Sequence, residues 1–138
     1  MARPKKEEKL WHVLVAEDDL KHRAKLLKVL RPLAQCVTVD NGEQALTAYQ
    51  KAIRSKKPFD FILLDVTMPL LDGFSVLKTI RANEEARNVP FFQHAHIFMI
   101  TAYKDSLMEM YNMGWDEYIT KPVDTDTLIA KMKKMAES

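Results

Sequence analysis

The chain has 138 residues, 47% of them hydrophobic, which is enough for one compact domain with its own core. Its 21 basic and 19 acidic residues leave a net charge of +2, so no overall field favours direct binding to nucleic acid. A single cysteine, Cys36, excludes an internal disulfide and favours a reducing, cytoplasmic location. No apolar run approaches the roughly 20 residues of a membrane span, which argues against membrane insertion.

The ends of the chain set the expected domain bounds. Residues 1–9 are charged and contain proline, which is typical of a disordered leader. No repeat, low-complexity segment or linker interrupts residues 10–138. We therefore expect a single domain over 10–138 and no attached output domain.

Short apolar segments alternate with segments of helical periodicity along this domain. Strands are predicted at 13–15, 36–39, 59–64, 97–100 and 118–119. The helices that follow them are predicted around 20–30, 45–53, 74–80, 107–111 and 128–135. Five such units without hairpin signals predict an α/β fold, with a parallel sheet covered by helices on both faces.

Polar side chains follow four of the predicted strands. They are Glu17, Asp18, Asp19, Asp65, Thr101 and Lys121. Since parallel strands place their carboxyl ends at one edge of the sheet, these side chains are expected to converge there. Grouped carboxylates raise one another's pKa unless a hard cation holds them ionised, and Mg²⁺ suits such a site with phosphate oxygens as further ligands.

This arrangement is typical of phosphoryl transfer. Asp65 is left as the nucleophile, because Lys121 is expected to supply positive charge and Thr101 a hydroxyl donor to the phosphoryl oxygens.

Four segments of the chain carry a resemblance to a known family. They are Val13 to Asp19, Leu64 to Gly73, Ile100 to Ala102 and Tyr118 to Pro122, in that order. Over about residues 11–136 the chain resembles the receiver domains of response regulators in two-component signalling, of the single-domain type found in chemotaxis. The resemblance implies a flavodoxin-like doubly wound (βα)5 fold with strand order 2-1-3-4-5.

The resemblance also implies how the site works. Asp65 is the phosphoacceptor, and the implied Mg²⁺ ligands are Glu17, Asp18, Asp65 and the backbone carbonyl of Thr67. Asp19 is expected to act only as a helix cap.

A conformational switch is implied as well. Thr101 is expected to move toward the phosphoryl group and Tyr118 to swing inward behind it. Lys121 is expected to precede a cis peptide bond to Pro122.

The partners of the family follow from its phosphorelay chemistry. The phosphodonor is a histidine of a sensor histidine kinase or of a histidine phosphotransfer protein. The receiver catalyses only its own phosphorylation and dephosphorylation, so it is not expected to be an enzyme. The downstream protein is expected on the face formed by the fourth helix, the fifth strand and the fifth helix.

Thr67 and Tyr103 occupy the positions expected to tune the lifetime of the phosphorylated state. Bulky Tyr103 is predicted to hinder the hydrolytic water and to lengthen that lifetime. Hydrolysis within seconds that Tyr103→Ala leaves unchanged would contradict this hypothesis.

Two other functions use related features. A phosphatase of the haloacid-dehalogenase type also has a strand-end Asp nucleophile with Mg²⁺, but it requires a second Asp where this chain has Thr67. A flavodoxin-like FMN carrier needs phosphate-binding donors after the first strand, where this chain is acidic. Bound yellow flavin would identify the second alternative.

The segment after Pro90 departs from the family pattern. Residues 91–96 look inserted before the fourth strand, and they should lie at the sheet edge away from the phosphorylation site. The adjacent Phe91 and Phe92 either pack under the domain or face a partner. His94 and His96 lack a suitably spaced third ligand for a metal.

Overall fold

Five parallel strands form one sheet in the computed structural model, which describes residues 9–102 and 113–137. The strands are β1 (Trp11–Ala16), β2 (Ala34–Val39), β3 (Phe61–Asp65), β4 (His96–Thr101) and β5 (Glu117–Thr120). Their order is β2-β1-β3-β4-β5, and every neighbouring pair is parallel. The predicted α/β, doubly wound fold with strand order 2-1-3-4-5 is confirmed.

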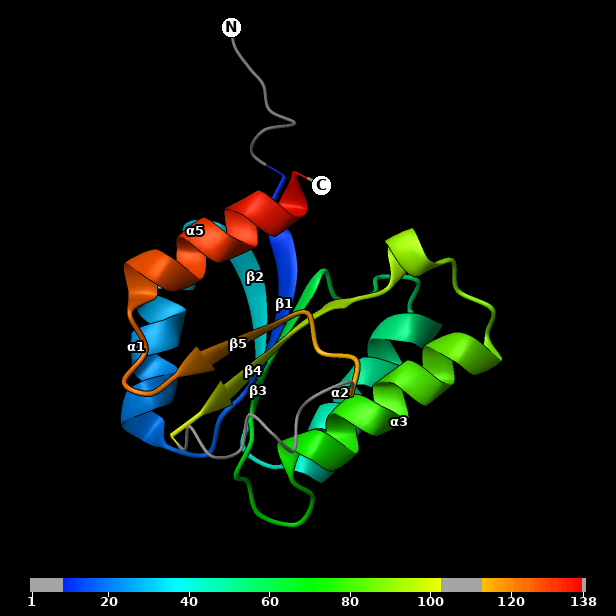
Figure 1. The fold of residues 1–138 in the computed structure, drawn as a ribbon, viewed down its shortest axis with the longest axis horizontal. Helices are drawn as coiled ribbons and strands as arrows, with labels where there is room; N and C mark the ends of the chain where they lie inside the picture. The colour runs from blue at the N-terminus through cyan, green and yellow to red at the C-terminus, as the bar shows by residue number, and fades with distance from the viewer. Residues whose placement is uncertain (1–8, 103–112, 138) are drawn as a thin grey trace, which may run out of the picture.

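Helices cover both faces of this sheet (Figure 1). They are α1 (Leu20–Leu30), α2 (Gly42–Arg54), α3 (Gly73–Ala86) and α5 (Thr125–Ala136). One core cluster joins α1 and α5 to the sheet and the other joins α2 and α3. The helix predicted around 107–111, like most of the leader predicted at 1–9, lies outside the described residues. No helix in the described ranges is both long and apolar enough to cross a membrane.

Strand β3 is buried along its whole length, as its apolar sequence predicts for a central parallel strand. Ile62 and Leu64 belong to the core on the α2–α3 side, whereas Phe61 and Leu63 belong to the core on the other side. The strand begins at Phe61, two residues after the predicted start. Asp60, just before it, accepts a hydrogen bond from the backbone N–H of His12 at 2.8 Å. Asp65 is the last residue of this central strand, so it lies at the carboxyl edge of the sheet.

Each of the four helices begins after an Asp or Asn that caps it. Asp19, Asn41, Asp72 and Asp124 all have a side chain that accepts a hydrogen bond from a backbone N–H in the first turn. The predicted role of Asp19 as a helix cap is therefore confirmed. Because these caps follow the strands closely, the helix starts frame the carboxyl edge of the sheet.

The start of α3 lies directly against the end of β3. The N–H of Gly73 donates to the Val66 carbonyl at 2.9 Å, and a Cβ at Gly73 would lie 2.4 Å from the Asp65 carbonyl oxygen. Only glycine fits at this distance, so Gly73 allows the close approach that fixes the backbone around Asp65.

Candidate functional site

Asp65 and Glu17 are two buried carboxylates at the carboxyl edge of the sheet. Asp65 is 4% exposed and ends β3, and Glu17 is 1% exposed and directly follows β1. The Nζ of Lys121 lies 3.2 Å from Oδ2 of Asp65 and 3.1 Å from Oε1 of Glu17. Buried carboxylates are rarely tolerated without a partner, so Lys121 stabilises both by bridging them.

Backbone groups complete the environment of these carboxylates. The N–H of Thr67 donates to Oδ1 of Asp65 at 3.1 Å, and the N–H of Asp19 donates to Oε2 of Glu17 at 3.1 Å. Both donors come from the loops that follow the strands, so each carboxylate is oriented by its own loop. Oε1 of Glu17 is buried and has no hydrogen-bond partner, although it lies within ion-pair distance of Lys121.

Asp18 adds an exposed carboxylate to the two buried ones. One oxygen from each of Glu17, Asp18 and Asp65 lies within 4.8 Å of the others. Within residues 9–102 and 113–137, no other group of three or more His, Cys, Asp or Glu side chains converges in this way, so His94 and His96 do not belong to one. Three carboxylates and a buried oxygen without a hydrogen bond fit a hard cation such as Mg²⁺.

The electrostatics of the surrounding side chains favour a proton on Asp65. Burial, the contact with Glu17 and the repulsion from its charge raise the pKa of Asp65 to about 7, against the opposing effects of Lys121 and the Thr67 N–H. Burial alone would lower the pKa of Lys121, but the two carboxylates outweigh it and raise this pKa above its usual value. Added positive charge is therefore needed to hold Asp65 fully ionised at neutral pH.

The raised pKa predicts a pH-dependent stability without metal. Between about pH 4 and pH 7 the native state keeps a proton that the unfolded state loses, so the free energy of unfolding should fall as pH rises. In EDTA, Asp65→Asn should raise the free energy of unfolding by about 1–2 kcal/mol at pH 8 and by much less near pH 4. Urea unfolding at both pH values measures this difference. An equal effect at both would contradict the raised pKa.

Comparison with known proteins agrees with this geometry. The family described as "Response regulator receiver domain" matches residues 13–133. The chain belongs to this family. The receiver domain is 33% identical over 129 residues to chemotaxis protein CheY-3 of Vibrio cholerae, an alignment that covers 91% of each chain.

Solved structures of other receiver domains share the fold. The receiver domain of a sensor histidine kinase from Pseudomonas aeruginosa has a TM-score of 0.77 and 25% identity, and covers 94% of this chain and 100% of its own. Magnesium is coordinated in its active-site cleft. Chemotaxis response regulator CheY4 of Vibrio cholerae has a TM-score of 0.76 and 25% identity, over 92% of this chain and 99% of its own.

The residues predicted to form the receiver's switch lie on β4, on β5 and directly after β5. Thr101 ends β4, is 1% exposed, and its carbonyl accepts a hydrogen bond from the Lys121 N–H at 2.8 Å. The bond between Lys121 and Pro122 is cis, as the family resemblance implied. Tyr118 is 36% exposed on β5, and its ring meets that of half-buried Trp115 edge-on, with 5.3 Å between centroids. Tyr118 therefore faces outward in this structure.

Some predicted roles remain predictions. Thr67 is exposed, and its N–H donates to Asp65. The role of its backbone carbonyl as a metal ligand stays a prediction. Tyr103 lies outside the described residues, as does part of the face predicted for the downstream protein. The inward movements of Thr101 and Tyr118 likewise stay predictions.

One residue of the site was missed at the level of sequence. Nη1 of Arg23, on α1, donates to the Glu17 carbonyl at 3.2 Å and so ties that helix to the acidic loop. An arginine in the first turns of a helix carries no motif, and only the helix cap at Asp19 indicates that it lies near the loop.

Proposed function

We propose that this receiver domain accepts a phosphoryl group on Asp65, with Mg²⁺, and passes the signal to a protein partner by a change in conformation. The observation that carries the proposal is the buried Asp65 carboxylate, held in an acidic cluster with Lys121 3.2 Å from its Oδ2. The phosphodonor would be the phosphohistidine of a sensor histidine kinase or a histidine phosphotransfer protein. A similar receiver domain from a sensor histidine kinase supports this class of partner.

The chain's own residues account for the transfer. A carboxylate oxygen of Asp65 attacks phosphorus and forms the P–O bond, while the P–N bond breaks and the imidazole leaves. The Thr67 N–H keeps Oδ1 oriented, and Lys121 lies where its charge offsets that of the phosphoryl oxygens. Glu17, Asp18 and Asp65 would hold Mg²⁺, which when bound supplies the charge that neutralises the phosphoryl group.

The family match and the absence of a second Asp at position 67 favour this function over a phosphatase. We infer that the chain catalyses only its own modification and turns over no separate substrate. The cytoplasmic location expected from Cys36 stays a prediction.

Mg²⁺ is expected to stabilise the fold through the acidic cluster. A ligand that binds only the native state at about one hundred times its Kd raises the free energy of unfolding by about 2.7 kcal/mol. Asp18→Asn should weaken this Mg²⁺-dependent rise in Tm while leaving the Tm in EDTA nearly unchanged, because Asp18 is exposed. Asp40→Asn, which removes an exposed carboxylate after β2, is the control. Equal Mg²⁺ responses in both variants would contradict the predicted ligand set.

Phosphoryl uptake tests the proposed function directly. The wild-type chain is incubated with acetyl phosphate, either with Mg²⁺ or with EDTA, and its intact mass is measured. We expect the mass of one phosphoryl group to be added with Mg²⁺ and almost none with EDTA. Wild-type protein that gains no mass with Mg²⁺, or gains it equally in EDTA, would contradict the proposal.

A further inference from the structure

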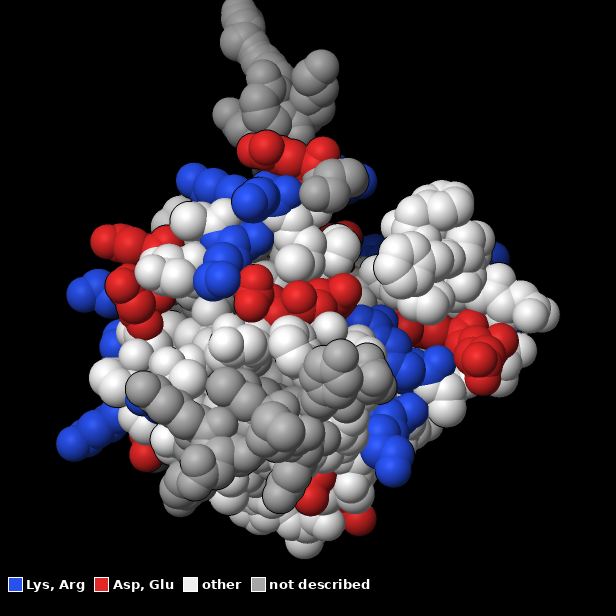
Figure 2. All heavy atoms as spheres, in the orientation of Figure 1, with Lys and Arg blue, Asp and Glu red and all other residues white. Residues whose placement is uncertain are grey.

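The loop that precedes β4 presents two phenylalanines to solvent. It contains the 3-10 turn η2 (Phe91–Gln93), in which Phe91 is 86% exposed and Phe92 is 81% exposed. The alternative in which these rings pack under the domain is therefore wrong. Figure 1 places this turn at the amino ends of the strands, and Figure 2 shows an uncharged bulge at the same place. As predicted, this segment lies away from Asp65.

Hydrogen bonds hold this loop in one shape. The N–H of Gln93 donates to the Pro90 carbonyl at 2.8 Å, and Nε2 of His94 lies 3.0 Å from the Val89 carbonyl. Below the turn, buried Glu84 accepts from the Ala95 N–H at 2.8 Å. Exposed aromatic rings on an ordered loop bind a partner at a lower entropic cost than rings on a flexible loop, because less conformational freedom is lost.

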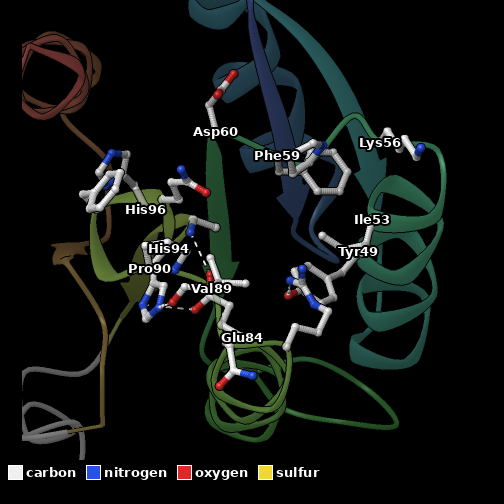
Figure 3. A pocket seen from close by; sticks show the side chains of 16 residues that line it. Tyr49, Ile53, Lys56, Phe59, Asp60, Glu84, Val89, Pro90, His94 and His96 are labelled. Carbon is white, nitrogen blue, oxygen red and sulfur yellow. Dashed lines mark hydrogen bonds and ion pairs between the residues drawn. The ribbon is translucent and has the colours of Figure 1, made fainter.

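A groove of about 740 Å³ lies beside the loop, between the ends of α2 and α3 (Figure 3). Its apolar lining includes Ile53, Phe59, Val89 and Phe92. Phe59 is buried at one side of the groove, and the exposed ring of Phe92 lies at its rim. A large apolar side chain of a partner would be buried between them.

The groove also carries positive charge that the protein itself does not neutralise. The guanidinium of Arg87 donates to the Asn83 side chain at 2.6 Å and to the Tyr49 hydroxyl at 2.9 Å, both uncharged. No carboxylate forms an ion pair with Arg87 or with exposed Lys56 in the described part of the chain.

Of the two carboxylates in the same groove, one is neutralised. Glu84 pairs with Arg81 at 2.6 Å, whereas Asp60 accepts a backbone N–H from His12 and forms no ion pair among the described residues. Lys56 and Arg87 therefore leave an excess of positive charge over Asp60 in the groove.

We propose that this groove, with Phe92 at its rim, binds an acidic protein segment that carries large apolar side chains. Carboxylates of the segment would pair with Lys56 and Arg87, while its apolar side chains pack on Phe92 and Phe59. A second copy of the chain fits less well, because its own exposed loop, 89–95, contains no acid. Nucleic acid fits less well, because the lining of the groove offers only one lysine and one arginine to phosphates, and a nucleic acid has no large apolar side chain to pack on Phe59 and Phe92.

The groove lies at the opposite end of the strands from Asp65, so binding should not depend on phosphorylation. This surface would hold a partner in place while the carboxyl edge reports the signal. The inference stands on the groove alone and does not require phosphoryl transfer at Asp65.

Fluorescence anisotropy with designed peptides on the full chain tests the inference. The probe is a short peptide that alternates Glu or Asp with Leu and Phe. Three ligands serve for comparison. The first is the same peptide with Lys in place of the acids, the second is the same peptide with Ser in place of the apolar residues, and the third is oligodeoxythymidine. We expect the acidic apolar peptide to bind at least about tenfold more tightly than any of the three, since it alone offers both chemistries.

Substitutions locate the binding. Phe92→Ser, and separately Lys56→Glu, should each weaken binding about tenfold or more. Leu20→Ser and Lys28→Glu remove an exposed apolar or basic side chain elsewhere and should leave the affinity unchanged. Circular dichroism checks that every variant is folded, and Mg²⁺ with acetyl phosphate should not alter the affinity.

Several results would overturn the inference. They are no preference for the acidic apolar peptide, tighter binding of oligodeoxythymidine, equal losses in the control variants, or an affinity that depends on acetyl phosphate. Concentration-dependent dimerisation that Phe92→Ser abolishes would make a second copy the occupant and would also contradict it.

Discussion

Asp65→Asn is expected to abolish phosphoryl uptake from acetyl phosphate. The amide has no carboxylate oxygen that can form an acyl phosphate, yet it matches the carboxylate in size and can still accept from the Thr67 N–H. Intact mass measured under conditions that modify the wild type should show a loss of at least about a hundredfold, consistent with removal of a nucleophile.

The matched control is Asp72→Asn, seven residues further along the chain. Asp72 caps α3 through a hydrogen bond from the Ser75 N–H at 2.9 Å, and asparagine caps helices equally well. The control should keep its fold and its phosphoryl uptake. Uptake that survives in Asp65→Asn, or that is lost in both variants, would remove the assignment of Asp65.

Arg81→Met is expected to destabilise the fold by about 3–5 kcal/mol, the usual cost of leaving a buried ion without its partner. The guanidinium of Arg81 lies 2.6 Å from Glu84 and 2.8 Å from Asp116, and it donates to the carbonyls of Gly114 and Ala95. Glu84 is only 2% exposed. Among the described residues, its carboxylate would keep only the Ala95 N–H and His94, 3.5 Å away, as polar neighbours.

A double substitution separates the ion pair from the rest of this network. Arg81→Met with Glu84→Leu removes both charges and should recover part of the lost stability, because no buried carboxylate is left unpaired. Arg54→Met, on the exposed surface of α2, should change the free energy of unfolding by less than about 0.5 kcal/mol. Urea unfolding measures all three. A double variant as unstable as the sum of its single substitutions would contradict the importance of the pair.

The sequence predicted the carboxyl edge of the sheet well because each group there follows a strand directly. Asp65 ends a wholly apolar strand and Glu17 follows another, so a parallel sheet brings them together whatever the details of the helices. The direct pairing of Lys121 with both carboxylates was not predicted, since the sequence suggested only a phosphoryl contact for it.

The opposite edge was less predictable for a physical reason. Arg81 and Glu84 are three residues apart on α3, a spacing that normally indicates a weak surface pair. Only the tertiary structure shows Glu84 to be buried and brings Ala95 and Asp116 to the same arginine. Likewise, the sequence left the placement of Phe91 and Phe92 open, because burial of a loop depends on the elements beneath it.

The two ends of β4 thus carry different features. Thr101 at its carboxyl end hydrogen-bonds through its carbonyl to the N–H of Lys121 in the acidic site, whereas His96 at its amino end lines the groove beside the loop of Phe91 and Phe92. A partner held at the groove would leave the carboxyl edge accessible to a phosphodonor. This separation is testable, because substitutions at one edge should leave the other unaffected.

Chemical trapping of the modified residue tests the central claim most directly. Reduction of an aspartyl phosphate with borohydride converts the aspartate into homoserine, which tandem mass spectrometry locates in the sequence. After treatment with acetyl phosphate and Mg²⁺, the account predicts homoserine at position 65 and at no other aspartate. Homoserine at Asp18 or Asp19, or a phosphoryl group on a histidine with position 65 unmodified, would contradict it.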